Sequence, residues 1–153
     1  MKRMHNPAIL KYLTLACIIS IVWQIFGGRQ YRYIYDFPII FGMNLYTLFA
    51  WALGLWAIII CYDYIEHKLK LKSFTTRFVV FILFYWTALI IAETIAFHWI
   101  GFKDLAVINY PGLPICNCIH GPWWMKIVYA CMGPIMYSTS RWMKIRNVFD
   151  KKQ

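Results

Sequence analysis

The chain has 153 residues, of which 61% are hydrophobic and 20% are aromatic, while only 14% are charged. Soluble domains carry about 25% charged residues, so this composition excludes an ordinary soluble protein and indicates a membrane protein. The formal net charge is +10, but the basic residues stand between apolar runs and not on one polar face. That distribution excludes nucleic acid as the expected partner and favours membrane lipids.

Four apolar runs have about the length that a helix needs to cross a bilayer, which is roughly 20 residues. We place these spans at about 8–26, 38–62, 78–100 and 122–140, within a single transmembrane domain that covers 1–153. Pro38 and Pro122 are expected in the first turn of their helices, where proline is favoured. The predicted fold class is an all-α integral membrane protein, a four-helix transmembrane bundle.

The positive charges are divided unequally between the two sides of the predicted membrane. The side with both termini and the loop between the second and third spans carries twelve Lys and Arg residues: Lys2, Arg3, Lys11, Lys68, Lys70, Lys72, Arg77, Arg141, Lys144, Arg146, Lys151 and Lys152. The other side carries three, Arg29, Arg32 and Lys103. Because basic loops stay in the cytoplasm, we expect both termini to be cytoplasmic, in a bacterial cytoplasmic membrane.

Two connecting segments carry further predictions. The segment 101–120 contains Pro111, Gly112 and Pro114 in otherwise apolar sequence, and we expect it to be partly re-entrant, with protein covering its backbone. At the end of the second span, Asp63, Glu66 and His67 share one helical face. That spacing fits a metal cluster, but the lysines nearby favour a solvated helix end in which the carboxylates meet lysines.

Strongly polar side chains gather in the outer half of the predicted bilayer. Glu93 lies inside the third span, His98 lies near its end, and His120 lies just before the fourth span. Ionisable groups within a span are costly, so their presence indicates function. We predict that Glu93 is a catalytic acid or base with His98 and His120 as catalytic partners. The structural alternative is a Glu93 carboxyl that is protonated or hydrogen-bonded to a neighbouring helix.

Residues at a similar depth predict a binding cavity lined by Trp and Tyr. We expect Asn44, Tyr110, Trp123 and Lys126 to contact an apolar or amphiphilic ligand such as a lipid, an isoprenoid or a quinone. Lys126 is also the nearest cationic candidate for Glu93 by depth. Side chains lean toward the N-terminus of their helix, which sends these two apart, so snorkelling of Lys126 is the alternative.

Cys116, Cys118 and His120 form a C-x-C-x-H sequence with the residue types of a metal site. It lacks the second pair of ligands that a zinc site needs. A redox dithiol is another interpretation, although four-span quinone-coupled thiol oxidoreductases use C-x-x-C and a second cysteine pair, which this chain does not show. We expect Cys116 and Cys118 to react with an impermeant thiol reagent, and Cys17, Cys61 and Cys131 to be protected.

The lead functional hypothesis is a small polytopic membrane protein that binds, and in one version converts, an apolar or amphiphilic molecule. The main alternative is a non-catalytic subunit of a larger membrane complex. In that case the small residues Gly42, Ala50 and Gly54 would let partner helices approach, and Glu93 would meet a partner's cation. A further alternative is a redox protein with thiols, or with a haem held by His98 and His120. A transporter would need self-association. The sequence leaves the cofactor unassigned and the question of catalysis open.

Overall fold

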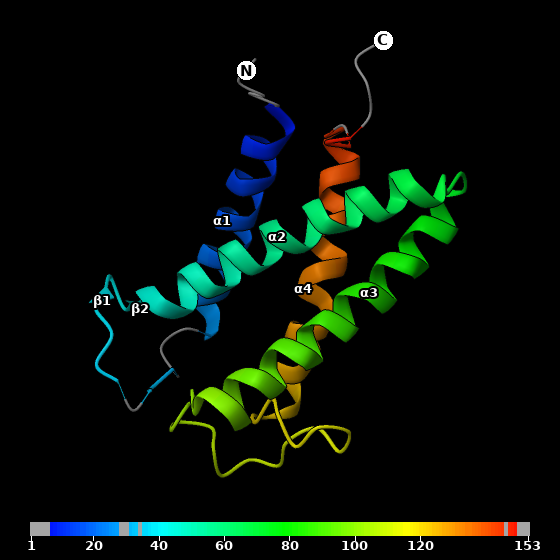
Figure 1. The fold of residues 1–153 in the computed structure, drawn as a ribbon. Helices are drawn as coiled ribbons and strands as arrows, with labels where there is room; N and C mark the ends of the chain where they lie inside the picture. The colour runs from blue at the N-terminus through cyan, green and yellow to red at the C-terminus, as the bar shows by residue number, and fades with distance from the viewer. Residues whose placement is uncertain (1–6, 28–30, 34, 146, 150–153) are drawn as a thin grey trace.

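The computed structural model describes residues 7–27, 31–33, 35–145 and 147–149, and it is all-helical apart from one short hairpin (Figure 1). The long helices are α1 (Pro7–Gly27), α2 (Leu45–Leu69), α3 (Phe74–Thr94) and α4 (Trp123–Trp142). A π-helical segment, η2 (Ile95–Ile100), continues α3, and the strands β1 (Ile39–Ile40) and β2 (Met43–Asn44) precede α2. Six residues of the charge count lie outside the described residues: Lys2, Arg3, Arg29, Arg146, Lys151 and Lys152.

Three of the helices are long and apolar enough to cross a membrane: α1, α2, and α3 together with η2. This supports the predicted membrane character. Large apolar side chains cover the outer faces of these helices, which lipid covers more readily than water does. Examples are Ile18, Val22, Ile25, Phe49, Leu53, Val79, Leu83 and Ile91. Helix α4 has twenty residues but is less apolar than the other three. It contains polar residues such as Lys126 and Ser140, whose side chains are buried.

Two of the predicted helix starts are corrected by the structure. Helix α2 begins at Leu45 and not at Pro38, because Asn44 caps it: the Asn44 Oδ1 accepts a hydrogen bond from the Thr47 N–H at 3.2 Å. Pro38 instead precedes the β1–β2 hairpin. Pro122 is the N-cap of α4 and not its first helical residue.

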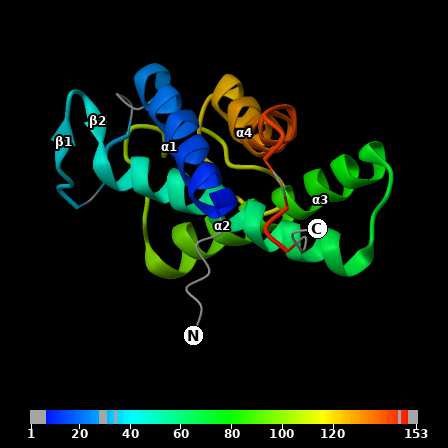
Figure 2. The same ribbon diagram turned by 90° about the horizontal axis from the view of Figure 1, so that it is seen from above.

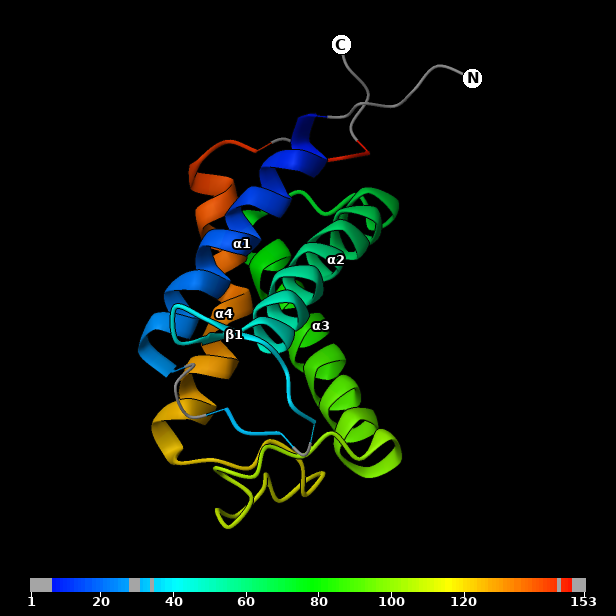
Figure 3. The same cartoon turned by 90° about the vertical axis from the view of Figure 1, so that its left-hand side faces the viewer.

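Helix α1 packs chiefly on α2 and also contacts α4, and α3 contacts both α4 and α2. Figures 2 and 3 show α1 and α4 side by side. The first turn of α1, the turn between α2 and α3 and the last turn of α4 lie at the same end (Figures 1 and 3). The loops that follow α1 and η2 lie at the opposite end. The chain therefore runs back and forth between two ends of the molecule.

At the end that holds the α2–α3 turn, two buried carboxylates and two partly buried arginines hold the helices together. This group, here called the charge cluster, consists of Asp63, Glu66, Arg77 and Arg141. The Arg141 Nη2 lies 2.8 Å from Asp63 Oδ1 and 2.9 Å from Glu66 Oε2. The Arg77 Nη1 lies 3.2 Å from Glu66 Oε1. Tyr12 of α1 donates a hydrogen bond to Asp63 Oδ2 at 2.9 Å. The cluster thus ties α1, α2, α3 and α4 together.

This arrangement shows that the prediction of a solvated helix end was wrong. The Asp63 side chain is fully buried, and Glu66 is only 6% exposed. Their partners are arginines and not the neighbouring lysines, and Arg141 lies 78 positions from Asp63 along the chain. Asp63 also accepts a hydrogen bond from the Val148 N–H at 2.9 Å. Among the described residues, no three His, Cys, Asp or Glu side chains are placed to hold a metal ion.

Helices α3 and α4 meet at the proline inside α4. Pro134 has no N–H, so the carbonyl four residues earlier, that of Ala130, lacks its helical donor. The Trp86 Nε1 of α3 donates to that carbonyl at 3.0 Å. Beside it, a side chain at Gly133 would come within 2.4 Å of the Tyr85 ring, so only glycine permits this approach. The contact places Tyr129 of α4 beside α3 at the level of the site described below.

We expect Arg141→Met to unfold the protein far more easily than wild type. It keeps an apolar stem but leaves Asp63 buried without its cation, which costs about 3–5 kcal/mol for a buried pair. The measurement is the midpoint of unfolding by temperature, and by sodium dodecyl sulfate, in mild detergent. Lys11→Met, at an exposed position of α1, is the matched control and should stay within about 0.5 kcal/mol of wild type. Equal midpoints for the two variants would contradict a stabilising charge cluster.

Candidate functional site

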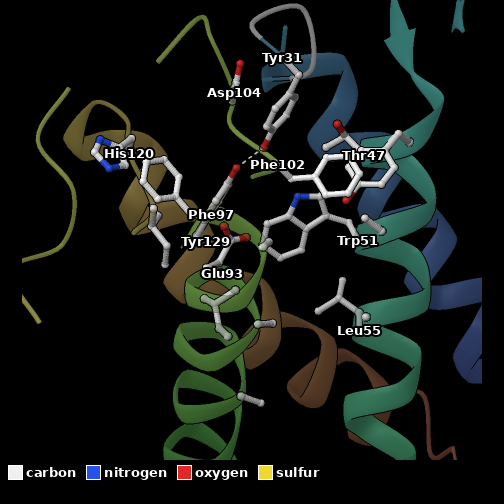
Figure 4. Close-up of a pocket in the computed structure, with 18 of the residues that line it drawn as sticks. Tyr31, Thr47, Trp51, Leu55, Glu93, Phe97, Phe102, Asp104, His120 and Tyr129 are labelled. Atoms are coloured by element: carbon white, nitrogen blue, oxygen red, sulfur yellow. Dashed lines mark hydrogen bonds between the residues drawn. The ribbon is translucent and has the colours of Figure 1, made fainter. Parts of the chain in front are cut away.

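A cavity of about 290 Å³ lies between α2 and α3, at the end away from the charge cluster (Figure 4). The two helices provide its walls, and Tyr129 of α4 closes one side. The loop after α1 contributes Tyr31 and Tyr33, and the segment after η2 contributes Phe102, Asp104 and His120. The site thus combines residues of α2, α3, η2 and α4 with residues of two loops.

The cavity exists because small residues face each other across the gap between the two helices. Ala50 and Gly54 lie on α2, and Ala88, Ala92 and Ala96 repeat every four residues along α3 and η2, which places them on one face. A side-chain carbon at Gly54 would have no atom within 4 Å. Within the described chain Ala50 and Gly54 line open space, and Gly42 lies in the turn between β1 and β2. The approach of a partner helix to these residues stays a prediction.

Glu93 points from α3 into this cavity, toward the side that holds Trp51 (Figure 4). The side chain is partly buried. Within the described residues, neither a hydrogen bond nor a neighbouring charge acts on its carboxyl. The change from α-helix to π-helix comes directly after Thr94, and such changes are frequent at functional sites. The structural alternative of a Glu93 carboxyl that is hydrogen-bonded to a neighbouring helix therefore has no partner group among the described residues.

Asp104 forms part of the cavity wall where two loops meet. Tyr33 and Asp104 pair as an isolated antiparallel bridge. The Asp104 Oδ1 accepts hydrogen bonds from the N–H groups of Arg32 at 2.8 Å and Ala106 at 3.1 Å. The other oxygen, Oδ2, is buried and has no partner among the described residues. Burial raises the pKa of the Asp104 carboxyl above its ordinary value, and the two N–H groups partly oppose that shift.

Aromatic side chains form most of the remaining lining. The Trp51 ring lies edge-on to the Tyr129 ring, with their centroids 4.7 Å apart. The hydroxyls of Tyr31 and Tyr129 are hydrogen-bonded to each other, and Trp23 Nε1 donates to the Tyr31 hydroxyl at 2.9 Å. Burial raises the pKa of Tyr31 and Tyr33, so these hydroxyls stay neutral. The lining is therefore aromatic, with neutral hydroxyls and two carboxyl groups.

The two histidines stabilise the loop and do not face each other across a metal or haem position. The His98 Nε2 donates to the Cys116 carbonyl at 3.0 Å. The His120 nitrogens lie 2.7 Å from the Tyr110 carbonyl and 3.1 Å from the Asn117 carbonyl. His120 also lines the cavity, with its ring stacked on Phe97 at 4.5 Å. Of the predicted catalytic residues, the structure brings Glu93 and His120 to one cavity and leaves His98 outside its lining.

None of the four predicted binding residues lines this cavity. Asn44 caps α2, and Tyr110 accepts a hydrogen bond from His120 through its carbonyl. The Lys126 Nζ donates to the Pro111 carbonyl at 2.6 Å and lies over the Trp123 ring at 5.0 Å, while Trp123 itself is exposed. Lys126 is therefore bonded to a loop carbonyl and is not paired with Glu93.

The lining residues that sequence reasoning did not name include Trp51, Phe97, Phe102, Asp104, Tyr31, Tyr33 and Tyr129. Trp51 lies one helical turn before Gly54, and Phe97 lies one turn after Glu93. The helical period therefore predicts that each shares a face with that residue. Asp104 and Phe102 lie in a loop, where no periodicity marks a shared surface.

Cys116 and Cys118 form a disulfide bond, which corrects the expectation of two reagent-accessible thiols. Cys118 is also fully buried. With the two sulfurs bonded to each other, the C-x-C-x-H sequence offers no thiolate to a metal. The expectation that Cys61 and Cys131 are protected rests on lipid alone, because both side chains are exposed on their helices.

Comparison with known proteins gave no match: no family model, curated protein sequence or solved structure is significantly similar to this chain. The assignment of a function therefore rests on the cavity itself.

We expect Asp104→Ala to destabilise the contact between the two loops, because the N–H groups of Arg32 and Ala106 lose their acceptor. The expected cost is about 1–3 kcal/mol. Asp104→Asn keeps an acceptor oxygen and should cost less. The folded-state pKa of Asp104 is raised, so wild type should lose stability relative to Asp104→Asn as the pH rises from about 3.9, the ordinary Asp value, through the raised pKa.

Thermal unfolding of these variants in detergent at several pH values checks both statements. Asp36→Ala, an exposed position, is the control for loss of one negative charge. If Asp104→Ala and Asp36→Ala unfold at the same temperature, the hydrogen bonds from Arg32 and Ala106 do not hold the loops together.

Proposed function

We propose that this protein binds an amphiphilic molecule in the cavity between α2 and α3. The observation that carries the proposal is the Glu93 carboxyl, which faces an aromatic cavity and finds no partner among the described residues. Binding sites for small molecules are mostly apolar and contain a few polar groups that orient the ligand, which matches this lining. An unpaired carboxyl inside an apolar region is costly, so a ligand that contacts it offsets that cost.

We further propose that all four long helices cross the membrane, with both termini in the cytoplasm and the cavity in the outer half. The described basic residues near the charge cluster include Lys68, Lys70 and Lys72, whereas the cavity end has Arg32 and Lys103. Basic residues favour the cytoplasmic side. The buried polar groups of α4 face protein and not lipid, which lowers the cost of placing that helix in a bilayer.

The size of the cavity supports a ligand that is held by one end. Pockets for drug-sized ligands are about 300–1,000 Å³, so a cavity of about 290 Å³ fits a head group and the first part of a tail. A lipid, an isoprenoid or a quinone would leave its remaining chain between the diverging helices or in the bilayer. In the catalytic version of this proposal, Glu93 exchanges a proton with the bound ligand.

A second candidate is a subunit of a larger membrane complex. The observation that favours it is the exposure of α3. In the apolar stretch of Phe74–Ile100 only 11% of the residues are buried, whereas the corresponding shares are 33% for α1 and 28% for α2. A partner helix on α3 would cover that apolar face. A stable complex that purifies with this chain, and that dissociates when bulky polar residues are placed at Leu83 and Ile91, would favour this candidate.

The test of ligand binding is to fill the cavity from α2. Gly54→Leu places a side chain in open space and removes a helix-destabilising glycine, so the variant should fold at least as well as wild type. Native mass spectrometry of protein purified in mild detergent should show a bound molecule on wild type and its loss, by about tenfold or more, on Gly54→Leu, if the blocked contacts contribute about 1.4 kcal/mol or more.

Ala57→Leu is the matched control, because Ala57 lies one turn away on the exposed face of α2 and outside the cavity lining. It should retain the bound molecule. The proposal fails if Gly54→Leu retains as much bound molecule as Ala57→Leu, or if folded wild type carries none after extraction from its own membrane.

A further inference from the structure

The ionisable groups that line the cavity differ from those that dominate the chain. The sequence has 16 Lys and Arg residues against 6 Asp and Glu residues. Nevertheless the cavity is lined by two carboxyl groups, those of Glu93 and Asp104, and by no Lys or Arg among the described residues. The other buried carboxyl groups, those of Asp63 and Glu66, are paired with arginines. Among the described residues, Glu93 and Asp104 have no such ion pair, and both line the cavity.

The basic side chains near the cavity are engaged elsewhere. The Lys103 Nζ lies 5.0 Å from the centroid of the Phe97 ring and pairs with neither carboxyl. The Lys126 Nζ is bonded to the Pro111 carbonyl. Both His120 nitrogens lie at carbonyl oxygens, and Arg32 contacts Asp104 through its backbone N–H. Within the described chain, no basic side chain stands where it neutralises Glu93 or Asp104.

The aromatic walls add a second feature that attracts a cation. The rings of Trp51, Tyr129, Phe97 and Phe102 line the same space as the two carboxyl groups (Figure 4). The Tyr33 ring also lines it. The face of an aromatic ring carries partial negative charge and attracts ammonium groups. Lys103 already uses the Phe97 ring in this way. An ammonium head group in the cavity would gain ring contacts and a carboxylate partner at once.

We infer that the ligand of this cavity has a positively charged, ammonium-type head group and an apolar tail. This inference rests on the proposed function, because it specifies the ligand class for the same cavity. The head group lies beside Glu93 and against the ring of Trp51, and the tail follows the small-residue faces of α2 and α3. A ligand cation supplies the charge that a buried carboxylate otherwise lacks.

The experiment compares three ten-carbon probes that differ in the head group: decyltrimethylammonium, decan-1-ol and decanoate. Binding to the full-length protein is measured by isothermal titration calorimetry in an uncharged maltoside detergent at neutral pH, and Gly54→Leu protein gives the background. Decyltrimethylammonium should bind about tenfold or more tightly than decan-1-ol, since cation–π and ionic contacts together are worth at least about 1.4 kcal/mol. Decanoate should bind most weakly.

Substitutions then test which groups recognise the cation. Glu93→Gln keeps the shape of the side chain and should reduce the preference for decyltrimethylammonium over decan-1-ol by about tenfold, while decan-1-ol binding stays unchanged. Lys103→Met removes the cation that lies over the Phe97 ring and leaves both carboxyl groups unchanged. It should therefore leave the preference the same or increase it. Unfolding temperatures of both variants show whether they remain folded.

Two results would overturn the inference, and they differ in what they imply for the proposed function. If decan-1-ol binds above the Gly54→Leu background and decyltrimethylammonium binds no better, the cavity takes a neutral amphiphile and the proposed function stands. If none of the three probes binds above that background, the ammonium ligand is excluded. The proposed function is then tested separately, by whether native mass spectrometry shows a bound molecule on wild type and its loss on Gly54→Leu.

Discussion

The buried pair of Asp63 and Arg141 is the contact on which the arrangement of the helices depends. Asp63 accepts hydrogen bonds from Arg141, Tyr12 and the Val148 N–H, so both carboxylate oxygens are satisfied in a region that excludes water. A buried ion pair costs desolvation energy and is tolerated when its hydrogen bonds are complete. Because the partners come from α1, α2, α4 and the segment after α4, the network fixes the relative positions of these elements at one end.

That fixed end explains why space remains at the other. Helices α2 and α3 are joined by a short turn beside the charge cluster, where Tyr62 of α2 donates a hydrogen bond to the Arg77 carbonyl of α3. Further along, the helices diverge (Figure 1), and the facing residues are alanine and glycine. Helix α4 closes one side of the gap, since Tyr85 and Trp86 hold α3 against the carbonyls of Tyr129 and Ala130. The cavity is therefore a consequence of helix packing and residue size.

Sequence reasoning located the four long helices, because apolar runs of about 20 residues usually form membrane-spanning helices. It also selected Glu93, since a carboxyl in an apolar run is rare and costly. It failed where the partner is far away in the chain, as for Asp63 and Arg141, and where local geometry decides, as for the Asn44 cap and the Cys116–Cys118 disulfide. The spacing of alanine and glycine marks a face, but it does not say whether a helix or an open space lies against that face, as Ala50 and Gly54 show.

The most direct test of this account is an experimental structure of the protein in a lipid environment, such as crystals grown from a lipidic mesophase. The account predicts that α2 and α3 are separated at Gly54 and Ala92, with density of a bound molecule between them and in contact with the Glu93 carboxyl. A structure in which α3 packs directly on Gly54, or in which a basic side chain of the protein itself pairs with Glu93, would contradict it.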